Sequence, residues 1–293
     1  MKTILVPTDF SKNATNALNY AAGLINQIGG ELIMVHFIEL PVTPLDGAMI
    51  VTPVAQLAEE YHQELTQQAD TLAKQFSGNI KIKAQCRFGD LLTNLNILIK
   101  NYNIDLVVMG TKGASNVLYK LVGTNTADFI KIANCPVLAV PDKAQFTGIN
   151  QIAYASDFES EESIFLQQLF AFAEPLQAEV AIINIIPERH LNIFSDNHVL
   201  REIKLQYADK KYSIAQIQEG DVLTGINEFV AETHPDVLAV SIHARSFLED
   251  IFHKSISKSL FYQVQLPLLA LPERTYWQSV FKPVTQAQNP LVK

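Results

Sequence analysis

The first part of the sequence returns in recognisable form in the second part. Residues 4–11, ILVPTDFS, recur 148 positions later as IAYASDFE, and residues 136–141, PVLAVP, recur 131 positions later as PLLALP. Solenoid repeats have periods of about 20 to 50 residues, so spacings this long indicate a duplicated domain. The length of 293 residues agrees with two domains of roughly 150 residues each. We expect the domains to cover residues 1–143 and 149–273, followed by a tail at residues 274–293.

The two spacings differ because the second half lacks 17 residues. The loss falls where the first half holds residues 40–49 and a long helical pattern over residues 53–76. Thr52 can cap that helix, Pro53 suits its first position, and apolar side chains recur at helical spacing behind them. The sequence therefore predicts a long amphipathic helix among the material that distinguishes the two halves.

Short apolar runs alternate with helical patterns in each half. In the first half, runs rich in β-branched residues predict strands at residues 2–7, 31–38, 80–87, 106–109 and 137–140. Helical periodicity predicts helices at about residues 11–28, 53–76, 91–101 and 125–133. Nearly continuous apolar strands are typical of a parallel sheet that is covered on both faces. Each half is therefore predicted to be an α/β domain with a doubly wound, five-stranded parallel sheet, whose ligand crevice lies beyond the carboxyl ends of the strands.

Composition and charge exclude several classes of function. A formal net charge of −8 repels phosphate backbones, so we expect no nucleic-acid partner. The longest apolar runs, such as residues 105–110, are far shorter than the roughly 20 residues of a membrane-spanning helix. Cys86 and Cys135 lack metal-ligand spacing, and we expect no metal site. The N-terminus enters a strand pattern at once and does not resemble a secretory signal, which favours a cytoplasmic protein.

A stretch that contains several glycines follows the fourth predicted strand. Gly110 and Gly113 come first, and Gly123 with Thr124 follows nine residues later. The pattern is neither a Walker loop nor the dinucleotide fingerprint. Glycine nevertheless lets the backbone approach a charged group closely.

The residues around these glycines favour an anion. The helix expected from Asn125 would present free N–H groups and the positive end of its dipole. Lys112 would add a mobile positive charge, and Thr124 and Thr126 would add hydroxyl donors. The sequence therefore predicts a phosphate site at this end of the sheet.

The same residues carry a family resemblance. The spacing Gly, two residues, Gly, nine residues, Gly and then Ser or Thr resembles the nucleotide-binding signature of the universal stress protein family. Residues 6–11, VPTDFS, and the pair His36-Phe37 resemble that family as well. The resemblance covers the five strands of each half, and it implies two adenine-nucleotide alpha-hydrolase-like, Rossmann-like domains in tandem that bind ATP, with or without Mg²⁺.

The resemblance also assigns roles around ATP. Pro7, Thr8 and Asp9 would lie against the adenine and ribose, and the backbone of Phe37 would contact the adenine. Met109 and Gly110 would lie near the ribose. The residues expected at the phosphates are Lys112, Gly113, Gly123, Thr124 and Asn125, the last standing where the family often has Val.

Structural roles stay open for several of these residues. Asp9 could complete a helix cap, and Gly110 and Gly113 could be ordinary turn glycines. His36 and Met109 are more often packing residues than ligand groups.

The second half departs from the signature. Ser241, Ala244 and Lys254 stand where the first half has its three glycines, and each adds a Cβ where backbone should approach phosphate. Asp157, the counterpart of Asp9, is then expected to serve helix capping or the domain interface. Arg245 and Ser255 keep polar donors nearby, which leaves a different anion possible. We expect one conventional nucleotide per chain, in the first half.

In proteins of this family the fifth strands pair across a dimer interface. The resemblance therefore implies that residues 137–140 and 268–271 pair within this chain, which would make it an intramolecular pseudo-dimer and cover two apolar edges. A further homodimer stays open.

Nothing in the sequence supplies a complete set of catalytic groups. The first hypothesis is an ATP-binding stress-response or regulatory protein that acts on an unknown protein partner. The alternatives are a slow ATP hydrolase, with Asp9 holding a divalent ion, and an interaction scaffold that needs no nucleotide.

Overall fold

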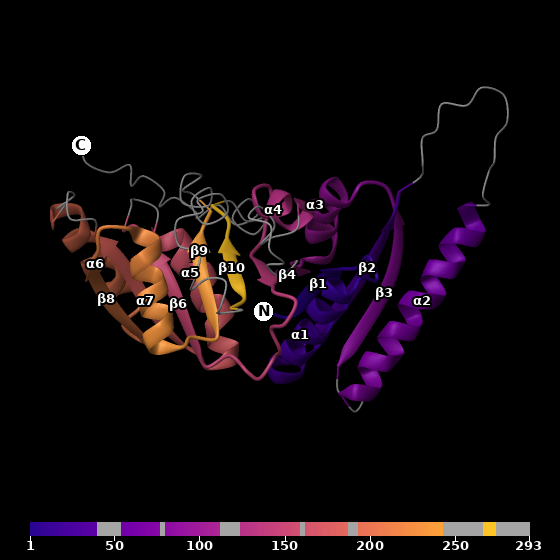
Figure 1. Ribbon diagram of the computed structural model, residues 1–293, viewed down its shortest axis with the longest axis horizontal. Coiled ribbons are helices and arrows are strands. Elements are labelled where there is room, and N and C mark those ends of the chain that lie inside the picture. Colours follow the sequence, from indigo (N-terminus) through magenta and orange to yellow (C-terminus); the bar gives the residue numbers. More distant parts are fainter. Residues whose placement is uncertain are drawn as a thin grey trace, which may run out of the picture.

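The computed structural model describes residues 1–39, 54–76, 80–111, 124–158, 162–186, 193–242 and 266–273. The described strands form one ten-stranded sheet in the order β3-β2-β1-β4-β5-β10-β9-β6-β7-β8. Figure 1 shows the strands of the first half on one side of the molecule and those of the second half on the other.

The bounds of the elements repeat between the halves. The strands of the first half are β1 (Thr3–Pro7), β2 (Glu31–Ile38), β3 (Lys81–Phe88), β4 (Leu106–Gly110) and β5 (Val137–Val140), and its helices are α1 (Lys12–Ile28), α2 (Val54–Gln75), α3 (Leu91–Tyr102) and α4 (Thr124–Ile130). The strands of the second half are β6 (Gln151–Ser156), β7 (Glu179–Ile186), β8 (Tyr212–Gln218), β9 (Val237–Ser241) and β10 (Leu268–Leu271), and its helices are α5 (Glu162–Ala173), the 3-10 turn η1 (Glu174–Leu176), α6 (Ile193–Gln206) and α7 (Val222–Thr233).

The predicted doubly wound α/β fold is confirmed. Neighbouring strands within each half are parallel, and β1 lies between β2 and β4 just as β6 lies between β7 and β9. The winding direction therefore reverses beside β1 and beside β6. Ligand crevices of such sheets form at the carboxyl ends of strands at this point.

The two halves join through one antiparallel strand pair. Strand β5 pairs with β10, with Leu138 opposite Leu269 and Ala139 opposite Leu268. The predicted pairing of the two fifth strands is confirmed. It leaves β3 and β8 as the edges of the described sheet.

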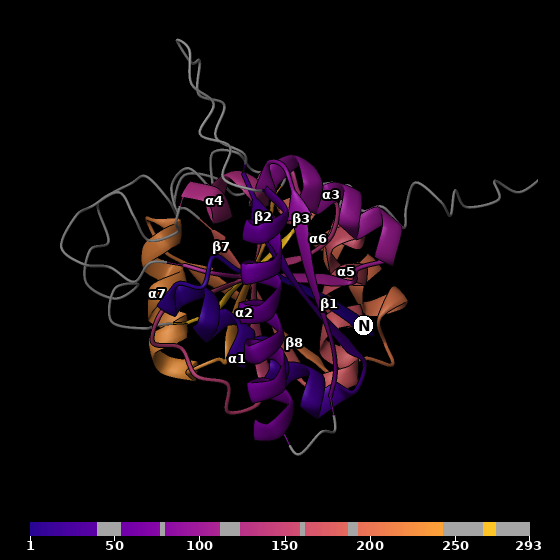
Figure 2. The ribbon, with the colours of Figure 1, turned by 90° about the vertical axis from the view of Figure 1, so that its right-hand side faces the viewer.

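A hydrophobic core lies on each face of the sheet. One core contains the buried side chains of α1, α2, α5 and α6, and the other contains those of α3, α4 and α7. In Figure 2, which faces the β3 end with α2 nearest the viewer, helices lie on both sides of the strands. Each core includes residues from both halves, and the domain boundaries at residues 143 and 149 therefore stay a prediction.

Four aspartates place elements in the same way in both halves. Asp90 and Asp221 cap α3 and α7, each accepting a hydrogen bond from a backbone N–H in the first turn, at 2.8 and 3.0 Å. The Oδ2 atoms of Asp105 and Asp236 each accept two N–H groups at the start of the first strand of their half, at 2.6 to 3.0 Å. These repeated bonds hold the sheet ends in register.

The missing 17 residues come from two places. Between the second strand and the following helix the first half has 15 residues, 39–53, and the second half has six, 187–192. Helix α2 has 22 residues, whereas α6 has 14. The two differences together account for the whole deletion, and the predicted long helix of the first half is confirmed.

The helix predicted at residues 125–133 ends earlier than expected. Helix α4 stops at Ile130, because Asn96 of α3 binds the chain beyond it. The Asn96 amide donates to the carbonyl of Ile132 at 2.8 Å and accepts from the N–H of Asn134 at 3.1 Å. Among the helices in the described ranges, none combines the length and apolarity that a membrane crossing requires.

Candidate functional site

A cleft of about 500 Å³ opens at the carboxyl ends of β1, β2 and β4. This is the place that the reversal of the winding predicts. Its walls also include the first turns of α1, α3 and α4. We call it the first-half cleft; its lining residues are Pro7, Thr8, Asp9, Ser11, Asn13, Ala14, His36, Phe37, Glu39, Leu91, Met109, Gly110, Asn125 and Thr126.

The cleft gathers residues that lie far apart in the sequence. The predicted site residues that line it are Pro7, Thr8, Asp9, Phe37, Met109, Gly110 and Asn125. Thr124 begins α4, directly before Asn125. Lys112, Gly113 and Gly123 lie outside the described residues. The structure thus brings the expected adenine and ribose residues together.

The turn between β1 and α1 is built from short side-chain bonds. The Thr8 hydroxyl accepts the N–H of Phe10 at 3.1 Å, and Asp9 Oδ1 accepts the N–H of Ser11 at 3.0 Å. Phe10 has a positive φ of 61°, a conformation that costs a bulky residue energy. Ser11 itself is the N-cap of α1, bonded to the N–H of Ala14. The suggested cap role of Asp9 therefore belongs to Ser11, and Asp9 instead tightens the preceding turn.

Asp9 has the chemistry to meet a magnesium ion. The side chain is exposed, and only its Oδ1 accepts a hydrogen bond from the described residues. The second carboxylate oxygen can therefore meet a hard cation, which prefers oxygen ligands. Among the described residues, no group of three or more His, Cys, Asp or Glu side chains could hold a metal ion.

His36 ties the end of β2 to the end of β1. Its Nδ1 lies 2.8 Å from the carbonyl oxygen of Thr8, so it donates to that oxygen, and its side chain is buried. The ring packs against both Phe10 and Tyr61, with centroid distances of 4.7 and 4.3 Å, and these two rings also stack on each other at 5.8 Å. In the second half the Asn184 amide donates to the carbonyl of Ser156 at 3.0 Å, at the equivalent positions. Both halves keep this bond, so we assign His36 to the fold and not to the nucleotide.

The pair of halves gives a direct test of His36. We expect His36→Asn, which copies the second half, to keep the free energy of unfolding within about 1 kcal/mol of the wild type. His36→Ala should lower it by about 2 kcal/mol, because the buried Thr8 carbonyl loses its donor. Urea unfolding followed by circular dichroism measures both. Equal losses in the two variants would show that ring packing, and not the hydrogen bond, carries the effect.

Gly110 is required by a close backbone contact. A Cβ at this position would lie 2.3 Å from the carbonyl oxygen of Asn13, in the first turn of α1. The carbonyl of Gly110 also accepts the hydroxyl of Thr126 at 3.0 Å, which ties α4 to the end of β4. Thr126 was expected to donate to a phosphate; its one hydroxyl hydrogen is used in this bond instead, and the side chain is buried.

The charged side chains that line the cleft are acidic. Its described lining contains two carboxylates, those of Asp9 and Glu39, and no lysine or arginine. Positive charge for a phosphate would therefore come from Lys112 and from backbone N–H groups. Ser11, Asn13, Ala14, Glu39 and Leu91 also line the cleft and had not been predicted; each follows a strand end or begins a helix, which is the signal that could have identified them.

The equivalent place in the second half is filled by a carboxyl group. Glu162 takes the position of Ala14, and its side chain is buried beside Ser156, Tyr154 and Ser241. Burial raises the pKa of Glu162 to about 7, although nearby Ser156 and Tyr154 oppose the rise. Ser241 stands in the place of Gly110. Gly110 has no Cβ and leaves space at the end of β4, whereas Ser241 has a Cβ at the end of β9. The second half therefore does not offer the same space.

The comparisons with known proteins agree with this architecture. The sequence model of the universal stress protein family matches residues 1–141. A universal stress protein of Methanocaldococcus jannaschii is 30% identical over 155 residues, covering 48% of this chain and 96% of that protein. Universal stress protein G of Escherichia coli O157:H7 is 27% identical, covering 47% of this chain and 98% of that protein. The chain belongs to the universal stress protein family.

Solved structures show that the likeness in fold extends over both halves of the chain. A universal stress protein from Archaeoglobus fulgidus superposes with a TM-score of 0.68 at 16% identity, covering 92% of this chain and 98% of that one. A protein of Pseudomonas aeruginosa superposes with a TM-score of 0.53 at 15% identity, covering 93% of this chain and 92% of that one. At these identities the likeness shows the fold alone.

Proposed function

We propose that the chain binds one adenine nucleotide, ATP, in the first-half cleft and acts as a nucleotide-responsive protein in stress response or regulation. The observation that carries the proposal is the cleft itself, which brings seven predicted nucleotide residues together at the carboxyl ends of β1, β2 and β4. Its volume of about 500 Å³ lies within the roughly 300–1,000 Å³ range of small-molecule sites.

The chemistry of the cleft suits the parts of a nucleotide in order. Pro7, Phe37 and Met109 supply apolar surface for a base, and Thr8 and Asp9 supply oxygen atoms for ribose hydroxyls. The phosphates would then extend toward Asn125 and the glycines outside the described residues. Asp9 would share a magnesium ion with them.

The proposal favours binding over turnover. The described lining holds no positively charged side chain to stabilise the charge that develops in phosphoryl transfer, and it holds no histidine other than His36, whose Nδ1 is engaged with Thr8. We expect nucleotide occupancy in the cytoplasm to change the surface that a protein partner meets. Hydrolysis, if measurable, would be slow.

Equilibrium binding of ATP with magnesium tests the proposal. We expect one ATP per chain, with affinity at least tenfold weaker in Asp9→Ala and in Gly113→Val. Asp157→Ala is the matched control, because Asp157 is the counterpart of Asp9, and it should leave affinity unchanged. Acid extraction of the purified protein should also release adenine nucleotide.

Three other outcomes would count against it. Two nucleotides per chain would contradict the restriction to the first half. Absence of both co-purified nucleotide and measurable affinity would leave the scaffold as the better description. Phosphate release with many turnovers, abolished by Asp9→Ala, would instead make the protein a hydrolase.

A further inference from the structure

A second hollow of about 580 Å³ lies beside the first-half cleft, between the end of β3 and the outer surface of α3. We call it the edge cleft; the residues used below are Phe37, Arg87, Phe88, Ile97 and Tyr102, all of which line it. Phe37 also lines the first-half cleft, so the two hollows share one aromatic wall. The volume again falls in the range of small-molecule sites.

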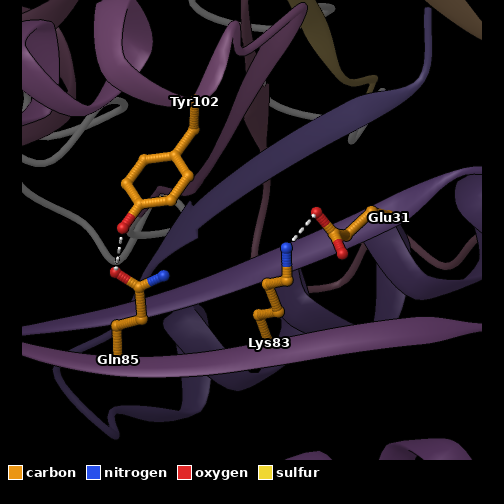
Figure 3. A network of polar contacts seen from close by, with 4 residues as sticks. All are labelled: Glu31, Lys83, Gln85 and Tyr102. Carbon is orange, nitrogen blue, oxygen red and sulfur yellow. Dashed lines mark hydrogen bonds and ion pairs between the residues drawn. The ribbon is translucent and has the colours of Figure 1, made fainter.

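Arg87 holds a positive charge in this cleft without an acidic partner. Its Nη2 donates to Gln85 Oε1 at 3.0 Å and to Tyr102 Oη at 2.9 Å, and both acceptors are neutral. Within the described part of the chain no carboxylate forms an ion pair with it. Lys83, two residues earlier on the same strand, has such a partner in Glu31 at 3.0 Å. Figure 3 shows the Lys83–Glu31 pair, and beside it Tyr102 of α3 reaching Gln85 of β3.

Two exposed apolar side chains stand at the rim. Phe88 is 48% exposed and Ile97 is 50% exposed. Only Ile132 and Leu205 are other large hydrophobic residues of comparable exposure among the described residues. A guanidinium that forms no ion pair within the described residues and lies next to apolar and aromatic surface is suited to a ligand with an oxyanion at one end and an apolar ring at the other, since arginine binds oxyanions through its fork and stacks on aromatic rings.

The second half shows that the fold does not require these residues. At the same positions in the repeat, 131 residues later, Gln218 replaces Arg87, Glu219 replaces Phe88 and Glu228 replaces Ile97. Those residues sit on the same elements, at the end of β8 and on α7. Gln and Glu are ordinary residues for a solvated edge, so the cation and the two apolar groups of the first half need another explanation.

We propose that the edge cleft is a binding site for an aromatic oxyanion, with Arg87 binding the oxyanion and Phe88, Ile97 and Tyr102 contacting the ring. The site goes beyond the proposed nucleotide function and does not depend on it. Because Phe37 separates the two hollows, each can be occupied with the other empty.

The fluorescent aromatic sulfonate 8-anilinonaphthalene-1-sulfonate serves as the probe. We expect saturable binding to the full chain, weakened at least tenfold by Arg87→Gln and by the double change Phe88→Glu with Ile97→Glu. These variants carry the residues of the second half, and circular dichroism should show an unchanged fold. Leu205→Glu, which removes an exposed apolar side chain elsewhere, is the matched control and should leave binding unchanged.

Competition with unlabelled compounds distinguishes a site that binds an oxyanion from an exposed apolar surface. 1-Naphthoate and 1-naphthyl phosphate should displace the probe, and the tighter of the two identifies a carboxylate or a phosphate as the preferred head group. Neutral 1-naphthalenemethanol should be at least tenfold weaker. Equal displacement by the neutral compound would overturn the proposal.

Two further results would also overturn it. If ATP displaces the probe while Arg87→Gln has no effect, the probe occupies the first-half cleft. If Arg87→Gln and the double variant change only the sedimentation behaviour, the exposed residues form an interface between protein chains. The probe experiment does not measure the affinity of the chain for ATP. If the edge cleft does not bind the probe, the proposed nucleotide function is therefore unaffected.

Discussion

Glu162→Gln is expected to stabilise the protein by about 3 kcal/mol at pH 8. Burial raises the pKa of this carboxyl to about 7, from an ordinary value of 4.5. The folded state therefore holds a proton that the unfolded state has released between these two values, and each pH unit in that window costs about 1.4 kcal/mol of stability. The stability that the neutral Glu162 carboxyl contributes is fully present below pH 4.5 and is lost as the pH rises through 7. Glutamine has no charge to bury, so the variant should not show this loss.

The surroundings of Glu162 support a neutral carboxyl in the folded state. Its Oε1 and the hydroxyl oxygen of Tyr154 are both buried, and within the described part of the chain neither has a hydrogen-bond partner of acceptable geometry, although the two groups are close enough to affect each other's pKa. Asp157 raises the pKa of Glu162 further. Tyr207, directly after the end of α6, lies near enough for the charge of Glu162 to raise its pKa, although burial is the main cause of that rise. No cation is among the groups that shift the pKa of Glu162.

Urea unfolding at pH 5, 6, 7 and 8 measures the effect. The difference between the variant and the wild type should grow from pH 5 to pH 7 and level off by pH 8, because the folded-state carboxyl ionises near pH 7. Glu174→Gln, at the start of η1 directly after α5 and half exposed, is the control and should show no comparable trend. A difference that stays constant with pH would mean that Glu162 remains charged in the folded protein.

Gly110→Ala is expected to lower the free energy of unfolding by about 2 to 3 kcal/mol. The new Cβ would lie 2.3 Å from the carbonyl oxygen of Asn13 and 2.6 Å from its carbon. Both are backbone atoms of α1, so relief requires the helix to move against β4, and overpacking of this kind typically costs 1–3 kcal/mol or more. A smaller opposite effect comes from the unfolded chain, which alanine stiffens by about 0.4–1 kcal/mol.

The control again comes from the second half. Ser241→Gly, at the equivalent position, removes a buried hydroxyl near Tyr154 and should change stability by about 1 kcal/mol beyond the added freedom of the unfolded chain. Urea unfolding of both variants makes the comparison. If Gly110→Ala is as stable as the wild type, the backbone of α1 does not require a glycine at this position. A bound ligand would then be the remaining reason for Gly110.

Hydrophobic periodicity and the internal repeat were sufficient to predict the fold. Strand positions were right to within one residue in the first half. Strands β1, β2, β4 and β5 are largely buried and read as apolar runs, whereas the edge strand β3 is partly exposed and its apolar residues alternate with polar ones. The end of α4 was wrong, because a side chain of α3 terminates it. Asn96 is near α4 only in the folded structure, and nothing in the local sequence reports that contact.

The candidate site could be predicted only where residues follow strand ends. Thr8, Asp9, Phe37 and Gly110 do so, and they line the cleft. The role of the Thr126 hydroxyl was wrong because its acceptor, the Gly110 carbonyl, lies 16 residues away in sequence. The buried Glu162 was not identified, because an acidic residue in the first turn of a helix is ordinary, and only the packing around it shows that water is excluded.

The antiparallel joint between β5 and β10 has a genetic consequence. In a dimer of identical chains, every substitution appears in both subunits, and a change that fills one crevice fills the other. Here the two partners of the joint belong to one polypeptide. One half can therefore carry Ser241 and Glu162 while the other carries Gly110 and Ala14, and every molecule contains one copy of each half in a ratio that expression cannot alter.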